Sequence, residues 1–256
     1  MKALVKYAKG NGNMEVRSIP EPVPGPGQVK IEVKAAGICG SDLHIYHDDI
    51  AIPVRPPVVT GHEFCGVIAE VGEGVEGLAV GDRVVTPGNQ GLGERGSYAE
   101  YVRAAAERVI KLPDHISMHD AATLPTAGMT AWEATMDVGQ TRSGQTVVVN
   151  GGAGGTGSFA IQIAKMAGAR VATTCSPRNF DYVASLGADH AINYREGDIV
   201  EQIMEKTKGK GVDRVIIAGG NVDTMIQAVA MLKPGGRVGN VNYLGTGDFV
   251  KIPRLE

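Results

Sequence analysis

Cysteines are scarce in this sequence, and their number limits both the redox environment and the metal chemistry. Cys39, Cys65 and Cys175 are the only three among 256 residues, and no CxxC pair occurs. An odd and low count argues against a disulfide framework and favours a reducing compartment, so we expect a cytoplasmic protein. A closed structural zinc site made of four cysteines is excluded by arithmetic.

Long apolar runs, basic clusters and aromatic residues are also lacking. No run approaches the roughly 18 apolar residues of a membrane span, and the first ten residues lack the apolar region of a signal peptide. We therefore expect no membrane partner, and because Lys and Arg do not cluster, we expect no nucleic acid as the main partner. Aromatic residues make up 5% of a chain that is 43% hydrophobic. A core of Val, Ile, Leu and Ala suits a parallel sheet covered by helices.

The chain has two parts with different patterns, which predict two domains. Residues 1–122 contain short alternating or apolar runs broken by Gly and Pro, which is typical of a β-rich domain with polar loops. Residues 123–256 alternate strand and helix patterns, so we expect an α/β domain with a parallel sheet and right-handed crossovers. Its expected strands are 146–150, 170–175, 190–194, 214–219 and 237–243. Near the boundary, residues 117–137 predict two short helices around Pro125.

A glycine-rich segment follows the first strand of the second part. Gly152, Gly154 and Gly157 have GxGxxG spacing between an expected strand and an expected helix, which is the context of a dinucleotide-binding loop. We expect a tight turn at Gly152, close approach of a pyrophosphate at Gly154, and helix–strand packing at Gly157. Gly155 and Thr156 complete the predicted cofactor loop at the helix N-terminus, where N–H groups are free to bind phosphates. The alternative is a glycine-rich connection without a ligand.

The end of the next strand bears on which dinucleotide binds. An NAD site needs an acidic residue about 20 residues after the glycines, to bind the ribose 2′-hydroxyl. Residues 173–180 contain no acid there, whereas Ser176 and Arg178 are suited to a 2′-phosphate, and Tyr194, at the end of the third strand, is placed to reach the same spot. The sequence therefore favours NADP(H) over NAD(H). The alternative for Arg178 is an ordinary solvated residue at the start of a helix.

A candidate metal site comes from the first part of the chain. Cys39 lies in GICGSDLH (37–44), and His62 and Glu63 lie in GHEF (61–64). Thiolate, imidazole and carboxylate are zinc ligands, and a catalytic zinc needs three of them with one open position. The alternatives are a buried apolar thiol at Cys39 and a hydrogen-bonded turn histidine at His62.

Three segments resemble the zinc-type medium-chain dehydrogenase/reductase family, which includes alcohol, sorbitol and threonine dehydrogenases. They are GICGSDLH, TGHEFCGVIAEVGEGVEGLAVGDRVV (60–85) and the glycine loop. The resemblance covers essentially the whole chain. It implies a GroES-like β-rich domain followed by a Rossmann domain with a doubly wound parallel sheet, with the active site in the cleft between them.

The resemblance also implies roles for single residues. Cys39 and His62 match zinc ligands, and Glu63 matches a glutamate that enters or leaves the coordination sphere. Ser41 matches the hydroxyl that takes the alcohol proton, and His44 matches a histidine that passes it to solvent. A further residue of the same segment, Asp42, matches a carboxylate that orients the zinc-bound histidine.

Three departures from the family pattern bear on the metal and on the extent of the chain. Thr126 occupies the position of the remaining zinc ligand, so either Glu63 completes the site or the metal is weak or absent. No structural-zinc lobe is expected, because residues 86–101 run straight through, as in the zinc-free quinone reductase branch. Family members continue for about another hundred residues beyond Glu256, so the Rossmann domain is expected to be incomplete, through truncation, a mosaic origin or engineering. Residues 213–256 resemble NADP-dependent secondary-alcohol dehydrogenases of bacteria.

Three functions are consistent with this reading. The preferred one is an NADP(H)-dependent oxidoreductase of class EC 1.1.1 acting, with zinc, on a small alcohol, ketone or aldehyde. The first alternative is a zinc-free NADPH-dependent quinone or enone reductase, and the second is an NADPH-binding module without turnover. An edge strand at 237–243 would favour self-association, so a homo-oligomer stays open.

Overall fold

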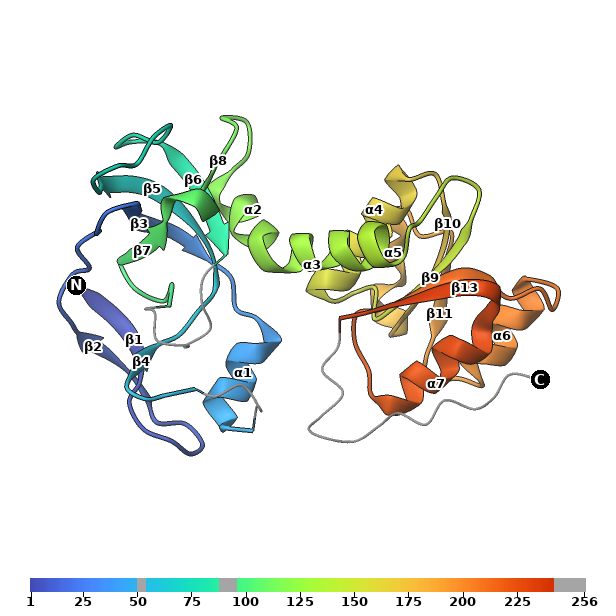
Figure 1. The fold of residues 1–256 in the computed structure, drawn as a ribbon. Helices are drawn as coiled ribbons and strands as arrows, with labels where there is room; N and C mark the ends of the chain where they lie inside the picture. The colour runs from blue at the N-terminus through green and yellow to red at the C-terminus, as the bar shows by residue number, and fades with distance from the viewer. Residues whose placement is uncertain (50–53, 88–95, 242–256) are drawn as a thin grey trace. The chain divides into compact units, whose positions relative to one another are not determined.

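The computed structural model describes residues 1–49, 54–87 and 96–241. The chain separates into two compact units, residues 1–126 and 127–256. Figure 1 shows the elements of each unit along the chain. Within the described residues, no helix combines the length and the apolar character needed to cross a membrane.

The first unit is built on two antiparallel sheets. A three-stranded sheet has the order β2-β1-β4, and a five-stranded sheet has the order β7-β3-β5-β6-β8. The strands are β1 (Lys2–Lys6), β2 (Met14–Ser18), β3 (Gln28–Ala36), β4 (Val58–Val59), β5 (Glu63–Val71), β6 (Arg83–Pro87), β7 (Tyr101–Ala105) and β8 (Ile110–Lys111). The helices are α1 (Gly40–His47), a 3₁₀ turn η1 (Ala106–Arg108) and α2 (Met118–Thr123). The unit is therefore β-rich.

Strands β3 and β5 form the centre of the larger sheet, and alternation decides which side chains they bury. Val29 and Ile31 of β3 point into the core together with Phe64 and Ile68 of β5, and all four are at most 1% exposed. Successive strand residues face opposite sides of a sheet, so residues two or four apart share one face. Burial of such side chains contributes about 1.5–3 kcal/mol each, which holds the two strands in register.

The end of β3 and the start of β5 lie side by side. Ala36 pairs with Phe64, and the Gly37 N–H donates to the Glu63 carbonyl at 2.8 Å. Because α1 begins directly after this point, its first residues are held next to the start of β5. The carboxyl end of α1 is also tied down: the ammonium of Lys6, fully buried at 0% exposure, donates to the carbonyls of Gly12 at 2.8 Å and Tyr46 at 3.2 Å.

The second unit contains a five-stranded, entirely parallel sheet with the order β11-β10-β9-β12-β13. The strands are β9 (Thr146–Asn150), β10 (Arg170–Cys175), β11 (His190–Asn193), β12 (Val212–Ile217) and β13 (Leu232–Asn240). The helices are α3 (Met129–Trp132), α4 (Gly155–Met166), η4 (Pro177–Asn179), α5 (Phe180–Ser185), α6 (Ile199–Lys206) and α7 (Val222–Met231). The order reverses between β9 and β12, so the carboxyl ends of these two strands form the switch point where α/β sheets bind ligands.

Both faces of this sheet are covered. Val147 and Val149 of β9 pack on the side of α4, and Val148 packs with Ile203 of α6 and Met231 of α7 on the other. All three valines are fully buried. A strand buried on both faces reads as a continuous apolar run, which is how TVVVN appears in the sequence.

The segment around Pro125 agrees with the sequence expectation, whereas the last strand differs from it. Two short α-helices, α2 (Met118–Thr123) and α3 (Met129–Trp132), lie on either side of Pro125, joined by the π-type turn η2 (Leu124–Gly128) and followed by a second one, η3 (Glu133–Val138). The Leu124 N–H donates to the Ala121 carbonyl, and Pro125, which has no N–H to donate, lies within η2. The last strand begins at Leu232 instead of at 237, and residues 242 and 243 lie outside the described chain.

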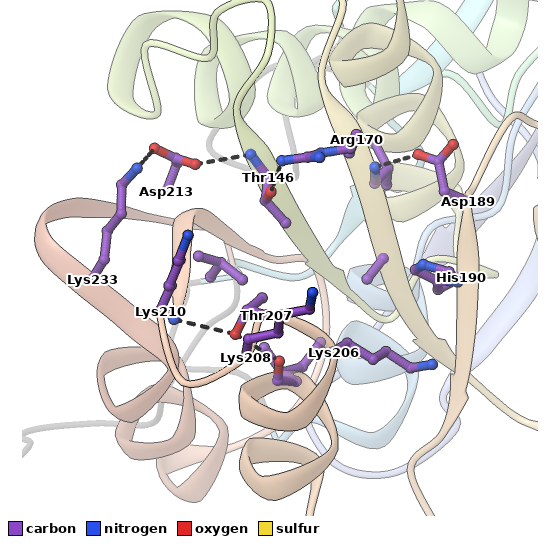
Figure 2. Close-up of a pocket in the computed structure, with 15 residues that line it drawn as sticks. Thr146, Arg170, Asp189, His190, Lys206, Thr207, Lys208, Lys210, Asp213 and Lys233 are labelled. Carbon is purple, nitrogen blue, oxygen red and sulfur yellow. Dashed lines mark hydrogen bonds and ion pairs between the residues drawn. The ribbon is translucent and has the colours of Figure 1, made fainter.

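Charged groups join the amino-terminal ends of the strands in the second unit, around a cavity of about 610 Å³ (Figure 2). Asp213 of β12 accepts the Thr146 N–H at 2.9 Å and forms an ion pair with Lys233. Burial alone would raise the pKa of Asp213, but Lys233 and the Thr146 N–H lower it overall. Lys206, Lys208 and Lys210 line the same cavity beside the carboxyl end of α6, whose partial negative charge they offset.

We predict that Asp213→Asn destabilises the protein in a pH-dependent way. The folded-state pKa is lowered, so the carboxylate stabilises the fold above its unfolded pKa of about 3.9, and this contribution disappears as the pH falls through the folded value. Urea unfolding should show a loss of about 1–2 kcal/mol at pH 7 that shrinks towards pH 3. Asp137→Asn is the control, because Asp137 is exposed and has no ion pair among the described residues. A loss that does not change with pH would contradict this account.

Candidate metal and cofactor sites

Cys39, His62 and Glu63 form a cluster in the first unit. One ligand atom from each, a sulfur, a ring nitrogen and a carboxylate oxygen, lies within 4.8 Å of the others. Cys39 is the residue before α1, His62 precedes β5 and Glu63 begins β5, so the β3–β5 pairing brings them together. His62 is 2% exposed and Glu63 is 8% exposed, whereas Cys39 is only partly buried. The cluster is therefore reachable from the Cys39 side.

Two glycines explain how neighbouring side chains at 62 and 63 serve one site. Gly61 has φ of +91°, a left-handed conformation that other residues adopt only with strain, and it turns the chain just before His62. Gly37 leaves room for the Glu63 carboxylate, because a Cβ at 37 would lie 2.5 Å from its Oε2. The glycines thus supply the turn and the space that the cluster needs.

Polar groups around the cluster orient His62. Its Nδ1 lies 3.6 Å from Asp42 Oδ1, and its Nε2 lies 3.3 Å from the Ser41 hydroxyl. A proton on Nδ1 facing the Asp42 carboxylate leaves Nε2 as the candidate ligand atom. Asp42 Oδ2 accepts the Cys39 N–H at 2.9 Å and the Tyr98 hydroxyl at 2.7 Å. Asp42 therefore touches groups on both sides of the cluster.

The acidity of Glu63 reflects its surroundings. Burial raises the pKa of its carboxyl and the charge of Asp42 raises it further, against the opposing effects of His62 and Cys39. The pKa of Tyr98 is raised as well, by burial and by its bond to Asp42. A divalent cation would favour the ionised form of Glu63.

Two other residues singled out from the sequence lie apart from the three ligand atoms. His44 stands on α1 with its side chain 59% exposed and its Nδ1 2.8 Å from Asp49 Oδ1. Thr126 directs its hydroxyl to the main chain, where it donates to the His62 carbonyl at 3.4 Å. The Thr126 side chain is thus engaged with the backbone of the cluster.

The glycine loop of the second unit joins β9 to α4, and its glycines have different tasks. The left-handed residue is Gly151, with φ of +77°, so the tight turn expected at Gly152 lies one residue earlier. A Cβ at Gly152 would lie 1.9 Å from Thr173 Oγ1, and one at Gly157 would lie 2.2 Å from the Gly151 carbonyl oxygen. At Gly154 the nearest atom would be 3.4 Å away. Packing therefore requires glycine at 152 and 157 but not at 154.

A second cavity of about 610 Å³ opens at the carboxyl ends of the strands in this unit. Four of the predicted cofactor residues line it: Gly154, Ser176, Arg178 and Tyr194. The other four are not part of its lining: Gly152, Gly155, Thr156 and Gly157. The cavity spans the β9–β12 switch point, so its position agrees with the usual place of a dinucleotide.

Residues not found from the sequence complete both sites. Tyr98 carries no motif, because a tyrosine between alternating strand residues gives no chemical signal. Asn221, Asp223 and Thr224 line the cofactor cavity from the start of α7, where Asn221 caps the helix. Asparagine after an expected strand is a helix-capping residue, so the sequence could have predicted that the start of this helix lies at the cavity.

Comparison with known proteins identifies the family. Residues 25–114 match the alcohol dehydrogenase GroES-like domain, and residues 155–255 match the zinc-binding dehydrogenase model. The sorbitol dehydrogenase of Halalkalibacterium halodurans is 37% identical over 286 residues, covering 100% of this chain and 82% of that protein. The chain belongs to the zinc-type medium-chain alcohol dehydrogenase family. As a member of this family, it is an NAD(P)-dependent oxidoreductase.

Two further relatives show the breadth of this alcohol dehydrogenase family. The NADP-dependent isopropanol dehydrogenase of Thermoanaerobacter brockii is 35% identical, over 92% of this chain and 74% of that protein. The structure of the quinone oxidoreductase from Coxiella burnetii has a TM-score of 0.81 and 32% identity, covering 93% of this chain and 74% of that one. The two-part fold, a GroES-like domain and a Rossmann sheet, agrees with the sequence expectation.

We predict that alanine substitutions separate the two kinds of glycine in the loop. Gly152→Ala should lower the free energy of unfolding by about 1–3 kcal/mol, because its methyl group collides with the buried Thr173 hydroxyl. Gly154→Ala should cost less than about 1 kcal/mol, since the added carbon meets no close atom. Urea unfolding of the two variants without nucleotide is the measurement, and equal losses would contradict the packing argument.

Proposed function

We propose that the chain interconverts small secondary alcohols with ketones, or alcohols with aldehydes, using NADP(H) and one zinc ion held by Cys39, His62 and Glu63. The observation that carries the proposal is that their ligand atoms lie within 4.8 Å of one another. His62 and Glu63 are nevertheless 23 and 24 residues from Cys39 in the sequence. A thiolate, an imidazole and a carboxylate match the ligand preference of zinc, and three ligands leave one position open for a substrate oxygen.

The third ligand is assigned to Glu63 on the basis of two contacts. The Thr126 hydroxyl donates to a main-chain carbonyl, and a neutral hydroxyl is a poor zinc ligand. The Glu63 carboxylate, in contrast, lies in the space that Gly37 leaves beside the cluster. Glu63 therefore substitutes for the ligand that the family places at position 126.

The chemistry divides between the bound groups and the protein. Zinc would polarise the alcohol oxygen and lower its pKa, and the nicotinamide would accept the hydride. Ser41, with its hydroxyl 3.3 Å from the proposed ligand nitrogen of His62, would accept the hydroxyl proton of the alcohol while releasing its own proton towards His44. His44, one turn later on α1 and exposed to solvent, passes the proton on. The alcohol thus loses one proton and one hydride and becomes a carbonyl compound.

The preference for NADP(H) rests on the end of β10. Ser176 and Arg178 line the cofactor cavity, where their hydroxyl and guanidinium groups suit a 2′-phosphate, and Tyr194 lines it from beyond β11. Asp223 is the acid in the lining, but it comes from α7 and not from the tip of β10. The NADP-dependent isopropanol dehydrogenase among the relatives supports the same preference.

We predict that Cys39→Ser removes zinc while leaving the fold intact. The purified wild type should contain about one zinc per chain, and the variant should bind zinc at least about tenfold more weakly, because a serine hydroxyl stays protonated where the thiolate would bind. Zinc content after dialysis and propan-2-ol oxidation with NADP⁺ are the measurements. Cys65→Ser is the matched control, since Cys65 lies in the same unit and its thiol donates a hydrogen bond to the Met118 carbonyl. Wild type without zinc that still reduces quinones would overturn the zinc assignment.

We predict that Arg178→Ala lowers the preference for NADPH over NADH by about tenfold or more. Loss of the guanidinium should weaken NADPH binding about tenfold or more and leave NADH binding nearly unchanged, because only NADPH carries the 2′-phosphate. Titration of both nucleotides by their fluorescence gives the two Kd values. Arg195→Ala is the control, because the Arg195 guanidinium lies 5.4 Å from the centre of the Tyr194 ring and is not part of the cavity lining. Equal weakening of both nucleotides would argue against a 2′-phosphate site.

The competing function is a zinc-free NADPH-dependent quinone or enone reductase, favoured by Thr126 at the usual ligand position and by the quinone oxidoreductase neighbour. A conjugated acceptor delocalises the arriving electron pair, so it needs no metal ion. Activity on short quinones that is unaffected by chelators would establish it. Nucleotide binding without turnover of alcohols, aldehydes or quinones would establish the third alternative, a binding module.

A further inference from the structure

Tyr98 lies beside the proposed zinc ligands without being one of them. Its hydroxyl is 2.7 Å from Asp42 Oδ2 and 2.9 Å from the Gly37 carbonyl oxygen. The phenol has one proton to donate, and the carboxylate is the stronger acceptor, so the bond to Asp42 dominates. Tyr98 therefore acts on Asp42.

Asp42 in turn contacts both ends of the cluster. Its Oδ2 accepts the main-chain N–H of Cys39 at 2.9 Å, and its Oδ1 lies 3.6 Å from His62 Nδ1. The residue is 7% exposed, so its carboxylate depends on these groups and on the Tyr98 hydroxyl instead of on water. With Oδ2 held by two donors, Oδ1 is turned towards the histidine ring.

The surrounding backbone holds the Tyr98 ring in place. Its N–H donates to the Thr60 carbonyl at 2.9 Å, and its carbonyl accepts the Leu4 N–H at 2.8 Å. Gly61 lets the ring approach, because a Cβ at 61 would lie 2.8 Å from a ring carbon. These contacts fix the position of the Tyr98 ring against the turn that precedes His62.

We infer that Tyr98 is a positioning residue for the metal site, which orients Asp42 and through it sets the ring orientation and ligand strength of His62. This inference rests on the proposed zinc site. A carboxylate that faces the other ring nitrogen of a ligand histidine, here at the ion-pair distance of 3.6 Å, favours one tautomer and strengthens the ligand, and loss of such partners lowers metal affinity about 10–100-fold. The hydroxyl of Tyr98 is one hydrogen bond further from the metal than Asp42, so its removal should have an effect at the lower end of that range.

Tyr98→Phe tests the inference, because it keeps the ring and removes only the hydroxyl. Zinc ions are titrated into metal-free protein against a chromogenic chelator, and cobalt ions are added to record the visible bands of the bound metal. We expect an approximately tenfold larger Kd for zinc and altered cobalt bands, with nucleotide binding at the second unit unchanged. Tyr101→Phe is the matched control, since its ring packs near Lys30 and no hydrogen bond of its hydroxyl is found among the described residues.

The outcomes separate the inference from the proposal on which it rests. Wild type and Tyr98→Phe that bind zinc equally, with identical cobalt bands, would overturn the inference and leave the zinc site standing. Wild type that binds no zinc would overturn the proposed function and the inference with it. Asp42→Asn and the double variant Asp42→Asn/Tyr98→Phe distinguish the inference from a general loss of structure. If Tyr98 acts through Asp42, the double variant should bind zinc as strongly as Asp42→Asn alone. If the losses of zinc affinity in the two single variants instead multiply in the double variant, the result would contradict the inference.

Discussion

The main-chain bond from Gly37 to Glu63, at the point where β3 ends and β5 begins, is the constraint on which the candidate active site depends. It is one rung of an antiparallel ladder whose register is held by the buried apolar faces of the two strands. Cys39 follows the end of one strand, and His62 comes just before the start of the other. A one-residue slip in register would turn Glu63 to the opposite face and dissolve the cluster.

Close approach of backbone to side chain is the shared requirement of both units. In the first unit, Gly37 makes room for the Glu63 carboxylate and Gly61 makes room for the Tyr98 ring. In the second, Gly152 makes room for the Thr173 hydroxyl. At each of these positions a single added carbon would meet an atom within 3 Å. The glycine content of the chain is thus partly explained by packing around the two candidate sites.

Some of this organisation was predictable because it depends on short-range patterns. The alternation of apolar runs with helical segments predicted the parallel sheet, whose strand order follows the doubly wound arrangement. The spacing of the glycines predicted the β9–α4 loop, although not that Gly151 makes its turn. Pro125 predicted the interruption between α2 and α3, although not the π-type turn that joins them, because that turn depends on neighbours that the pattern does not reveal. Tyr98 could not be found, because its role exists only through contacts with residues 37, 42 and 61.

By itself the sequence determined the residue types: a thiol, two imidazoles and two carboxylates in two short motifs, and a glycine loop between a strand and a helix. Residue types and the spacing within a short motif are local properties, so they can be read from the sequence without knowledge of the fold. Tertiary structure alone decided that the ligand atoms of Cys39, His62 and Glu63 lie within 4.8 Å of one another and that the Thr126 hydroxyl turns to the backbone. It also decided that Tyr98 reaches Asp42 from 56 residues away. These outcomes depend on which strands pair and in what register, which is settled by burial of the whole core and not by any single segment.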